Sequence, residues 1–235
     1  MTEALTALLQ VQSIRVCYGQ SEVISSISMS VSKGEIVAVM GLNGMGKTTL
    51  MKALIGLLST RAGTVTLGGR EITRDEPFER VAQGLAYVPQ GRMVFPTLTV
   101  EENIQTGLPP GKREIPPEIY KFFPVLLEMK KRRAGNLSGG QQQQLVIGRA
   151  LASRPRVLLL DEPTEGIQPS IIKELAVQLK AIRDEVGLTI VVSEQVLSFA
   201  LSVADRIIVL SRGAIVHESP RSGLDEESVG KLLSI

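Results

Sequence analysis

The chain has 235 residues, of which 43 % are hydrophobic and 21 % are charged, and its formal net charge is +2. This composition is that of a globular protein and excludes an intrinsically disordered chain, while the small net charge argues against binding to nucleic acid or a lipid surface through bulk charge. The single cysteine, Cys17, excludes an internal disulfide and a cysteine-based zinc site, and it fits a reducing compartment.

Neither a leader nor a membrane span is expected. Residues 1–15, MTEALTALLQVQSIR, lack a basic start and a long apolar run, so we expect no secretory signal. No stretch reaches the roughly 18 consecutive apolar residues of a membrane-spanning helix. The basic run from Lys130 to Arg133 is interpreted as a solvated helix end, with anion binding as the alternative. We therefore expect a soluble, cytoplasmic protein, built as one domain over residues 10–235.

Short β-rich runs alternate with helical patterns in the first part of the chain. EIVAVM (35–40) predicts a buried strand, and a glycine loop then leads into a helix from about Thr48 to Leu58. GTVTLGG (63–69) and GLAYVPQ (84–90) predict short strands bounded by turns.

A helical segment then interrupts this pattern, from about residue 97 to residue 153. It holds TVEENIQTGL, PPEIYKFFPVLLEMKKRR and a glutamine-rich helix, and the Gly- and Pro-rich stretch 107–117 divides the first two. The composition of the stretch indicates a loop, so we expect an inserted helical subdomain.

The alternation of strands and helices resumes after the insertion. Fully apolar strands that alternate with helices indicate a parallel sheet covered on both faces. The expected elements are strands at 156–163, 188–195 and 206–219, and helices at about 170–186 and 196–204.

GLNGMGKTT (41–49) matches the pattern G-x-x-x-x-G-K-[ST] and predicts a nucleotide site. The glycines let the loop curl so that successive N–H groups surround a phosphate, Lys47 reaches the β/γ oxygens, and Thr48 offers a hydroxyl to Mg²⁺. The competing interpretation is a glycine-rich turn with an exposed lysine. The candidate nucleotide-binding residues of this loop are Gly41, Leu42, Asn43, Gly44, Met45, Gly46, Lys47, Thr48 and Thr49.

VLLLDEP (157–163) presents two carboxylates where a buried strand ends. Beside a phosphate loop, Asp161 can hold Mg²⁺, usually through water, and Glu162 can orient or deprotonate the attacking water. The competing interpretation is two solvated acids at a strand end.

LSGGQQQQL (137–145) contains four glutamines that could form a solvated helix face. Ile147, Ala150 and Leu151 follow at helical spacing, which instead places the glutamines in the first turns of a packed helix. The Ser138–Gly140 stretch then lies at the helix N-terminus, where free N–H groups attract anions.

Together these motifs resemble the ATP-binding subunits of ABC transporters. The phosphate loop, YVPQ with Gln90, LSGGQ and LLLDEP occur in the family's order, and the resemblance covers roughly residues 10–235. It implies an α/β P-loop NTPase fold with a parallel-sheet core, an antiparallel β part and the inserted helical subdomain. It also implies an ATPase that uses ATP and Mg²⁺ at the cytoplasmic face of the inner (plasma) membrane, attached through permease subunits.

The resemblance implies further site roles. Ser138, Gly139 and Gly140 would cap the γ-phosphate of ATP held by the phosphate loop of a second subunit, so two ATPs would be sandwiched in a head-to-tail dimer. Tyr18 matches the aromatic residue that stacks on adenine, the alternative being a core tyrosine. Gln90 would contact Mg²⁺ or the water and transmit the nucleotide state to the membrane partner.

Two positions depart from the family pattern. Most members carry a histidine after the fifth strand that contacts the γ-phosphate; Gln195 stands there, and the chain's only histidine, His217, is far downstream. Glu162 should therefore carry more of the water activation. Gln168 stands where the aspartate that reaches across the dimer normally lies, so communication between the two ATP sites is less certain than hydrolysis.

These departures resemble the ATPases of branched-chain amino acid, amide and urea importers. IPPEIYKFFPVL, LSGGQQQQLVIGRAL and DEPTEGIQPSIIKEL look most like the second ATP-binding subunit of urea importers. Urea is therefore the expected substrate, with branched-chain amino acids or short amides as the alternative. The resemblance implies a heterodimer with a second ATPase (a homodimer is possible in isolation), two membrane permease subunits and a periplasmic or extracellular binding protein. GRMVFPTLTV (91–100) would receive a coupling helix, unless its apolar residues are locally buried.

The sequence disfavours two other classes of ATPase. ABC-type ATPases that act on DNA or ribosomes usually carry a coiled-coil insertion or two tandem units, and this chain lacks that length and their charge. A clamp that binds ATP without hydrolysing it is disfavoured because Glu162 supplies a water-activating carboxylate.

Overall fold

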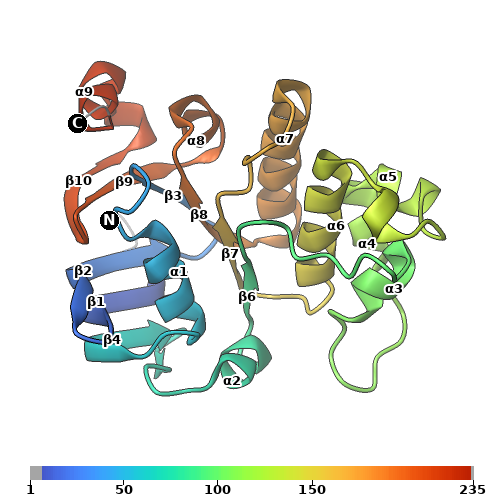
Figure 1. Ribbon diagram of the computed structural model, residues 1–235, viewed down its shortest axis with the longest axis horizontal. Coiled ribbons are helices and arrows are strands. Elements are labelled where there is room, and N and C mark those ends of the chain that lie inside the picture. The colour runs from blue at the N-terminus through green and yellow to red at the C-terminus, as the bar shows by residue number, and fades with distance from the viewer. Residues whose placement is uncertain (1–6, 234–235) are drawn as a thin grey trace, which may run out of the picture.

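The computed structural model describes residues 7–233, whose strands form one mixed sheet. The strand order is β5-β4-β1-β2-β10-β9-β3-β8-β7-β6. Figure 1 shows the antiparallel strands with α1 at one side and a group of helices at the other. None of the described helices is long and apolar enough to cross a membrane.

The antiparallel part consists of β1 (Ala7–Tyr18), β2 (Ser21–Ser32), β4 (Thr60–Leu67) and β5 (Arg70–Glu71). The pairs β1–β2, β1–β4 and β4–β5 are all antiparallel. The register between β1 and its neighbours shifts around Ser13, whose φ of 46° is left-handed. Such shifts interrupt the strict alternation of buried and exposed residues that identifies a strand.

The parallel part brings the carboxyl ends of five strands to one edge of the sheet. The neighbours β9–β3, β3–β8, β8–β7 and β7–β6 are all parallel, and β3, β7 and β8 are buried along their whole length. β10 (Ala214–Pro220) is antiparallel to β9 and joins the antiparallel part through one pair with β2. The parallel strands are β3 (Ile36–Met40), β6 (Leu85–Val88), β7 (Val157–Asp161), β8 (Thr189–Glu194) and β9 (Arg206–Ser211).

Helices α3 to α6 follow one another between β6 and β7 and lie together at one side of the molecule (Figure 1). The described helices are α1 (Lys47–Ile55), α2 (Pro77–Ala82), α3 (Val100–Gln105), α4 (Pro117–Phe122), α5 (Pro124–Glu128), α6 (Gly139–Leu151), α7 (Pro169–Val186), α8 (Leu197–Val203) and α9 (Glu226–Leu232), with 3₁₀ turns η1 (Ala134–Asn136) and η2 (Arg221–Gly223).

Two apolar clusters cover the two faces of the parallel strands, because successive side chains of a strand point to opposite faces. Val37 and Val39 of β3 pack in the cluster that contains α1, whereas Ala38 and Met40 pack in the cluster that contains α6, α7 and α8. The sheet is therefore covered on both faces, which confirms the expected fold class.

Some elements differ from the sequence prediction in extent. The helix expected from Thr48 to Leu58 ends at Ile55, because Gly56 takes a left-handed φ of 90°. The segment 206–219 is a hairpin rather than one strand, since Arg212 and Gly213 both have positive φ. The sequence patterns do not predict strands β1, β2 and β5 or helices α2 and α9.

Candidate nucleotide site

The phosphate loop lies between β3 and α1, and its shape depends on glycine. Gly44 and Gly46 have φ of 79° and 101°, which glycine adopts at no steric cost. A Cβ on Gly41 would lie 2.7 Å from the carbonyl oxygen of Leu210. Gly46 is also the N-cap of α1, so the N–H groups of the first turn meet no capping side chain there. The loop thus offers backbone donors to an anion.

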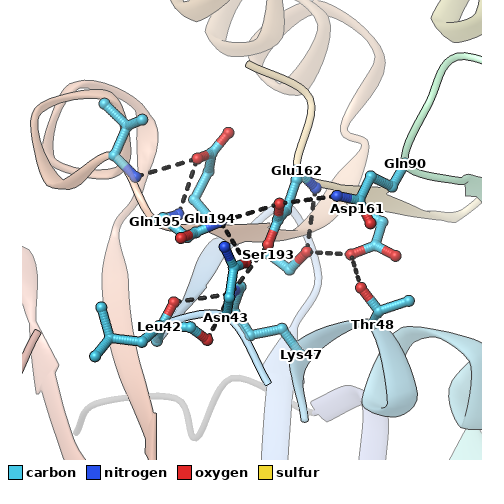
Figure 2. Close-up of polar contacts among 12 residues, drawn as sticks. Leu42, Asn43, Lys47, Thr48, Gln90, Asp161, Glu162, Ser193, Glu194 and Gln195 are labelled. Atoms are coloured by element: carbon cyan, nitrogen blue, oxygen red, sulfur yellow. Dashed lines mark hydrogen bonds and ion pairs between the residues drawn. The ribbon is translucent and has the colours of Figure 1, made fainter. Parts of the chain in front are cut away.

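Lys47, the first residue of α1, is buried and faces the carboxylate of Glu162. Its Nζ lies 3.0 Å from Oε1 of Glu162 and donates to the carbonyls of Gly41 at 2.8 Å and Leu42 at 3.1 Å. The interpretation of this segment as a turn with an exposed lysine is wrong. Lys47 and Glu162 are held together as Figure 2 shows, so any phosphate bound by Lys47 would be next to Glu162.

Asp161 is the last residue of β7, and its carboxylate accepts hydrogen bonds from three hydroxyl groups. Thr48 donates to Oδ1 at 3.1 Å, Ser193 donates to the same oxygen at 2.6 Å, and Tyr87 donates to Oδ2 at 3.1 Å. Burial, with a smaller contribution from the Asp161 charge, raises the pKa of Tyr87, so its phenol stays protonated and remains a donor. The carboxylate is therefore oriented by donors from two neighbouring strands, β6 and β8, and from helix α1.

Glu162 follows Asp161 with a left-handed φ of 46°, an unusual conformation for a non-glycine residue. Its Oε2 accepts from Nε2 of Gln90 at 3.2 Å and from Nε2 of Gln195 at 3.1 Å. Gln195 also donates to Oδ1 of Asn43 at 2.8 Å, so its side chain bridges Glu162 and the phosphate loop. These residues line a pocket of about 340 Å³ together with Thr164, Glu165, Gly166, Glu194 and Val196.

Tyr18 lies outside this cluster. It ends β1 with 46 % of its surface exposed, so the alternative of a core tyrosine is wrong and its ring is free to stack on a ligand. Gln168 is exposed at the N-cap of α7.

Ser138, Gly139 and Gly140 are not brought to the phosphate loop. Ser138 is the N-cap of α6, and its hydroxyl accepts from the backbone N–H of Gln141 at 3.3 Å. Figure 1 places α6 on the other side of β6 and β7 from α1. The following glutamines are not a solvated face, because Gln143 and Gln144 are buried.

Sequence reasoning missed four polar residues of the site: Tyr87, Thr164, Ser193 and Glu194. Thr164 and Glu194 share a hydrogen bond of 2.6 Å, and Ser193 binds Asp161. Their positions could have identified them, because each lies at or just beyond the carboxyl end of a parallel strand, where such sheets bind their ligands.

Comparisons with known proteins agree with this geometry. A family model described as ABC transporter matches residues 24–165. The high-affinity branched-chain amino acid transport ATP-binding protein BraG of Pseudomonas aeruginosa is 39% identical over 92% of this chain and 94% of its own length. A probable branched-chain amino acid transport ATP-binding protein LivF of Archaeoglobus fulgidus is 35% identical over 93% of this chain and 94% of its own length. The crystal structure of a nucleotide-free ATP-binding cassette from an ABC transporter superposes with a TM-score of 0.85 at 28% identity, covering 98% of this chain and 96% of that one.

The fold and the site define a nucleotide-hydrolysing α/β protein with its phosphate loop at the carboxyl edge of a parallel sheet. The chain belongs to the ABC transporter family, and it is an ATP-binding subunit that hydrolyses ATP. Both relatives named above are branched-chain amino acid transport proteins, so the expectation of urea finds no support in these comparisons and stays a prediction.

Proposed function

We propose that this chain is the ATPase subunit of an importer for branched-chain amino acids. The observation that carries the proposal is the 39% identity to BraG over nearly the full length of both chains. Urea is the second candidate, favoured by the resemblance of IPPEIYKFFPVL, LSGGQQQQLVIGRAL and DEPTEGIQPSIIKEL to the second ATP-binding subunit of urea importers. The transported molecule need not touch this subunit, so both substrate proposals rest on similarity rather than on the nucleotide site.

Uptake of labelled leucine and labelled urea in parallel tests the substrate. The cells lack the chain, or carry it with Lys47→Ala, and their urease and other permeases are controlled for. Loss of leucine uptake alone supports the proposal, and loss of urea uptake alone moves the assignment to urea. If neither uptake changes, both substrates are excluded.

The residues of the site fit ATP together with Mg²⁺. A threonine hydroxyl and a carboxylate 3.1 Å apart, those of Thr48 and Asp161, are the hard oxygen donors that Mg²⁺ takes, with phosphates and waters completing its shell. We assign Thr48, Asp161 and Gln90 to this cation, and residues 41–49 and Tyr18 to the nucleotide. Mg²⁺ supplies neutralisation of the charge on the β- and γ-phosphate oxygens.

Hydrolysis then depends on a change of partner at Lys47. In this structure Nζ of Lys47 lies 3.0 Å from Oε1 of Glu162. When a phosphate oxygen binds to Nζ instead, this ion pair breaks and the Glu162 carboxylate becomes free. The freed carboxylate orients the attacking water and accepts its proton, while the water oxygen bonds to the γ-phosphorus and the bond to the β–γ bridging oxygen breaks. Gln195 donates a hydrogen bond at this point but carries no charge, so Glu162 bears most of the water activation.

We propose further that the Ser138–Gly140 segment acts on ATP bound by another ATPase subunit. Its position on the other side of β6 and β7 from α1 supports this, since its own phosphate loop is out of reach (Figure 1). The working complex would be a head-to-tail dimer with a different ATPase, a homodimer being possible in isolation. Residues 97–153 would form a helical subdomain inserted in a single domain over residues 10–235.

An apolar groove supports docking of this chain to a membrane permease subunit. The working complex would contain two permease subunits and would be served by an external substrate-binding protein. Met93 and Phe95 are 64 % and 48 % exposed and Pro96 is exposed as well, which fits the expected docking loop, whereas Val94 is half-buried against the core. The groove has a volume of about 730 Å³ and continues over α2 and α6. Such a contact would hold the chain at the cytoplasmic face of the membrane. The residues that shape the groove include Phe78, Val81, Phe95, Leu108, Val146 and Arg149.

A further inference from the structure

Glu194 is a buried carboxylate at the end of β8, with 2 % of its surface exposed. Its Oε1 accepts from the backbone N–H of Thr164 at 3.1 Å and from the Thr164 hydroxyl at 2.6 Å. Its Oε2 accepts from the backbone N–H groups of Gln195 at 3.0 Å and Val196 at 3.2 Å. An ionised carboxylate has only acceptor sites, about four of them, so the four donors match its capacity.

These bonds join two loops that carry the proposed hydrolytic residues. Thr164 comes two residues after Glu162 in the loop after β7, and Gln195 opens the loop after β8. The side chain of Gln195 bonds to Glu162 at 3.1 Å and to Asn43 at 2.8 Å (Figure 2). The separation of the loops after β7 and β8 therefore decides whether Gln195 reaches Glu162.

Glu162 needs such support on both of its sides. On the strand side, its N–H donates to the carbonyl of Ser193 at 3.0 Å and to the Ser193 hydroxyl at 3.2 Å. A left-handed non-glycine residue persists only where its surroundings hold it. Beyond Glu162, the hydrogen bonds from Thr164 to Glu194 are the corresponding tie to β8.

We propose that Glu194 is a positioning residue for ATP hydrolysis, whose carboxylate clamps the loop after β7 to the loop after β8 and so holds Glu162 and Gln195 in register at the γ-phosphate site. This rests on the proposed roles of those two residues. Glu194 acts through them, because its carboxylate oxygens are taken by Thr164, Gln195 and Val196.

Glu194→Gln tests the clamp with little change of shape. One oxygen becomes an NH₂ group that faces two donors, so the bonds to one of the two loops are lost. Thr164→Val removes only the hydroxyl bond of 2.6 Å and leaves Glu194 in place. Thr164→Ser retains a hydroxyl and is the matched control.

ATP hydrolysis is measured with the chain in its purified transporter complex. We expect kcat to fall about tenfold or more in Glu194→Gln and about threefold in Thr164→Val, because small misplacements of reacting groups cost rate steeply. The KM for ATP stays within about twofold, since the phosphate loop is untouched, and Thr164→Ser retains wild-type kcat. Hydrogen exchange of the full chain without nucleotide gives a second readout: in Glu194→Gln either the amide of Thr164 or the amides of Gln195 and Val196 exchange faster, while those of β3 do not.

An unchanged kcat in Glu194→Gln overturns the proposal, as do unchanged exchange rates at the three amides. Faster exchange throughout β3, β7 and β8 with a parallel rise in KM also overturns it, because that pattern means a structural role only. If Glu194→Gln does not fold, equal kcat in Thr164→Val and Thr164→Ser overturns it. Lys47→Ala tests the proposed nucleotide site separately from the role of Glu194. If that variant hydrolysed ATP at the wild-type rate, the site function proposed above would itself be wrong.

Discussion

Lys47 and Glu162 form an ion pair that is almost completely shielded from water. Burying two charges is costly, and removing one partner leaves the other uncompensated. The pair makes sense at a site where a third charged group, a phosphate, competes for the lysine. The same two side chains thus stabilise the structure described here and are available for chemistry once they separate.

A double-mutant cycle on this pair should show strong coupling. We expect Lys47→Ala and Glu162→Gln each to lower the free energy of unfolding, and the double variant to lose about 1–3 kcal/mol less than their sum. Urea denaturation of the full chain measures this. The pair Arg154–Glu118, 3.3 Å apart with 72% and 35% of the side chains exposed, is the control and should couple by about 0.5 kcal/mol or less. Equal coupling in the two cycles would contradict the assignment of a buried pair.

Glu194 predicts a pH dependence of stability. Burial raises the pKa of its carboxyl above the ordinary 4.5, an effect larger than that of its four hydrogen bonds, which lower it. The folded state therefore binds this proton more tightly than the unfolded state. The stability contributed by proton binding is fully present below pH 4.5 and is lost as pH rises through the folded pKa.

Glu194→Gln removes this titration, so it isolates the effect. The difference in unfolding free energy, wild type minus variant, should fall as pH rises above about 4.5 and then level off. Urea denaturation between pH 4 and pH 8 gives the difference, in which groups common to both proteins cancel. A difference that increases with pH would mean that the hydrogen bonds, rather than burial, dominate the carboxyl.

At the scale of secondary-structure elements, the glycine motif at the start of α6 has a role in packing besides its proposed role in ligand binding. A Cβ on Gly140 would lie 2.7 Å from Cγ2 of Ile171 in α7, and Ile171 is β-branched and stiff. A Cβ on Gly139 would lie 3.2 Å from the end of the flexible Arg92 side chain. The two neighbouring glycines therefore differ in what they tolerate.

Gly140→Ala should destabilise the chain by about 1–3 kcal/mol, because the new methyl group forces α6 and α7 apart. Gly139→Ala should be neutral or stabilising by up to about 1 kcal/mol, since alanine is favoured over glycine in a helix. Thermal unfolding of both full-length variants checks this. If Gly139→Ala were the more destabilised of the two, the packing of α6 on α7 described here would be wrong.

The same scale shows what could be predicted from the sequence. The phosphate loop and Asp161–Glu162 were found because their signals are local, a glycine pattern and an apolar run that ends in acids. The roles of Tyr87 and Glu194 could not be predicted, because their contacts depend on which strands are neighbours in the sheet. β8 separates β3 from β7 in the sheet, and nothing in a linear pattern states that neighbourhood. Strands β1 and β2 could not be predicted, because register shifts interrupt their alternation of buried and exposed residues.

For the whole molecule, the arrangement of α1 and α6 determines what one chain can do alone. The phosphate loop opens at the carboxyl edge of the sheet, and Ser138–Gly140 lies beyond β6 and β7 (Figure 1). If Ser138–Gly140 acts on ATP as proposed, the chain carries two halves of a site that it cannot bring together, and a second chain in the opposite orientation would complement it. Nucleotide binding would then be linked to association, because ATP would be shared between two subunits.

Glu162→Gln should trap this association. Without the carboxylate, water is not activated, so bound ATP persists and, with the partner ATPase present, the elution volume should shift in ATP and Mg²⁺ from that of one subunit to that of two. Size exclusion with light scattering measures the mass. Adding Ser138→Arg to Glu162→Gln is the matched control: its own phosphate loop is intact, so it should bind ATP, yet the bulky side chain at the start of α6 should prevent the pairing. A nucleotide-dependent dimer that survives Ser138→Arg would place the contact elsewhere on the chain, and no dimer in Glu162→Gln would contradict the shared site.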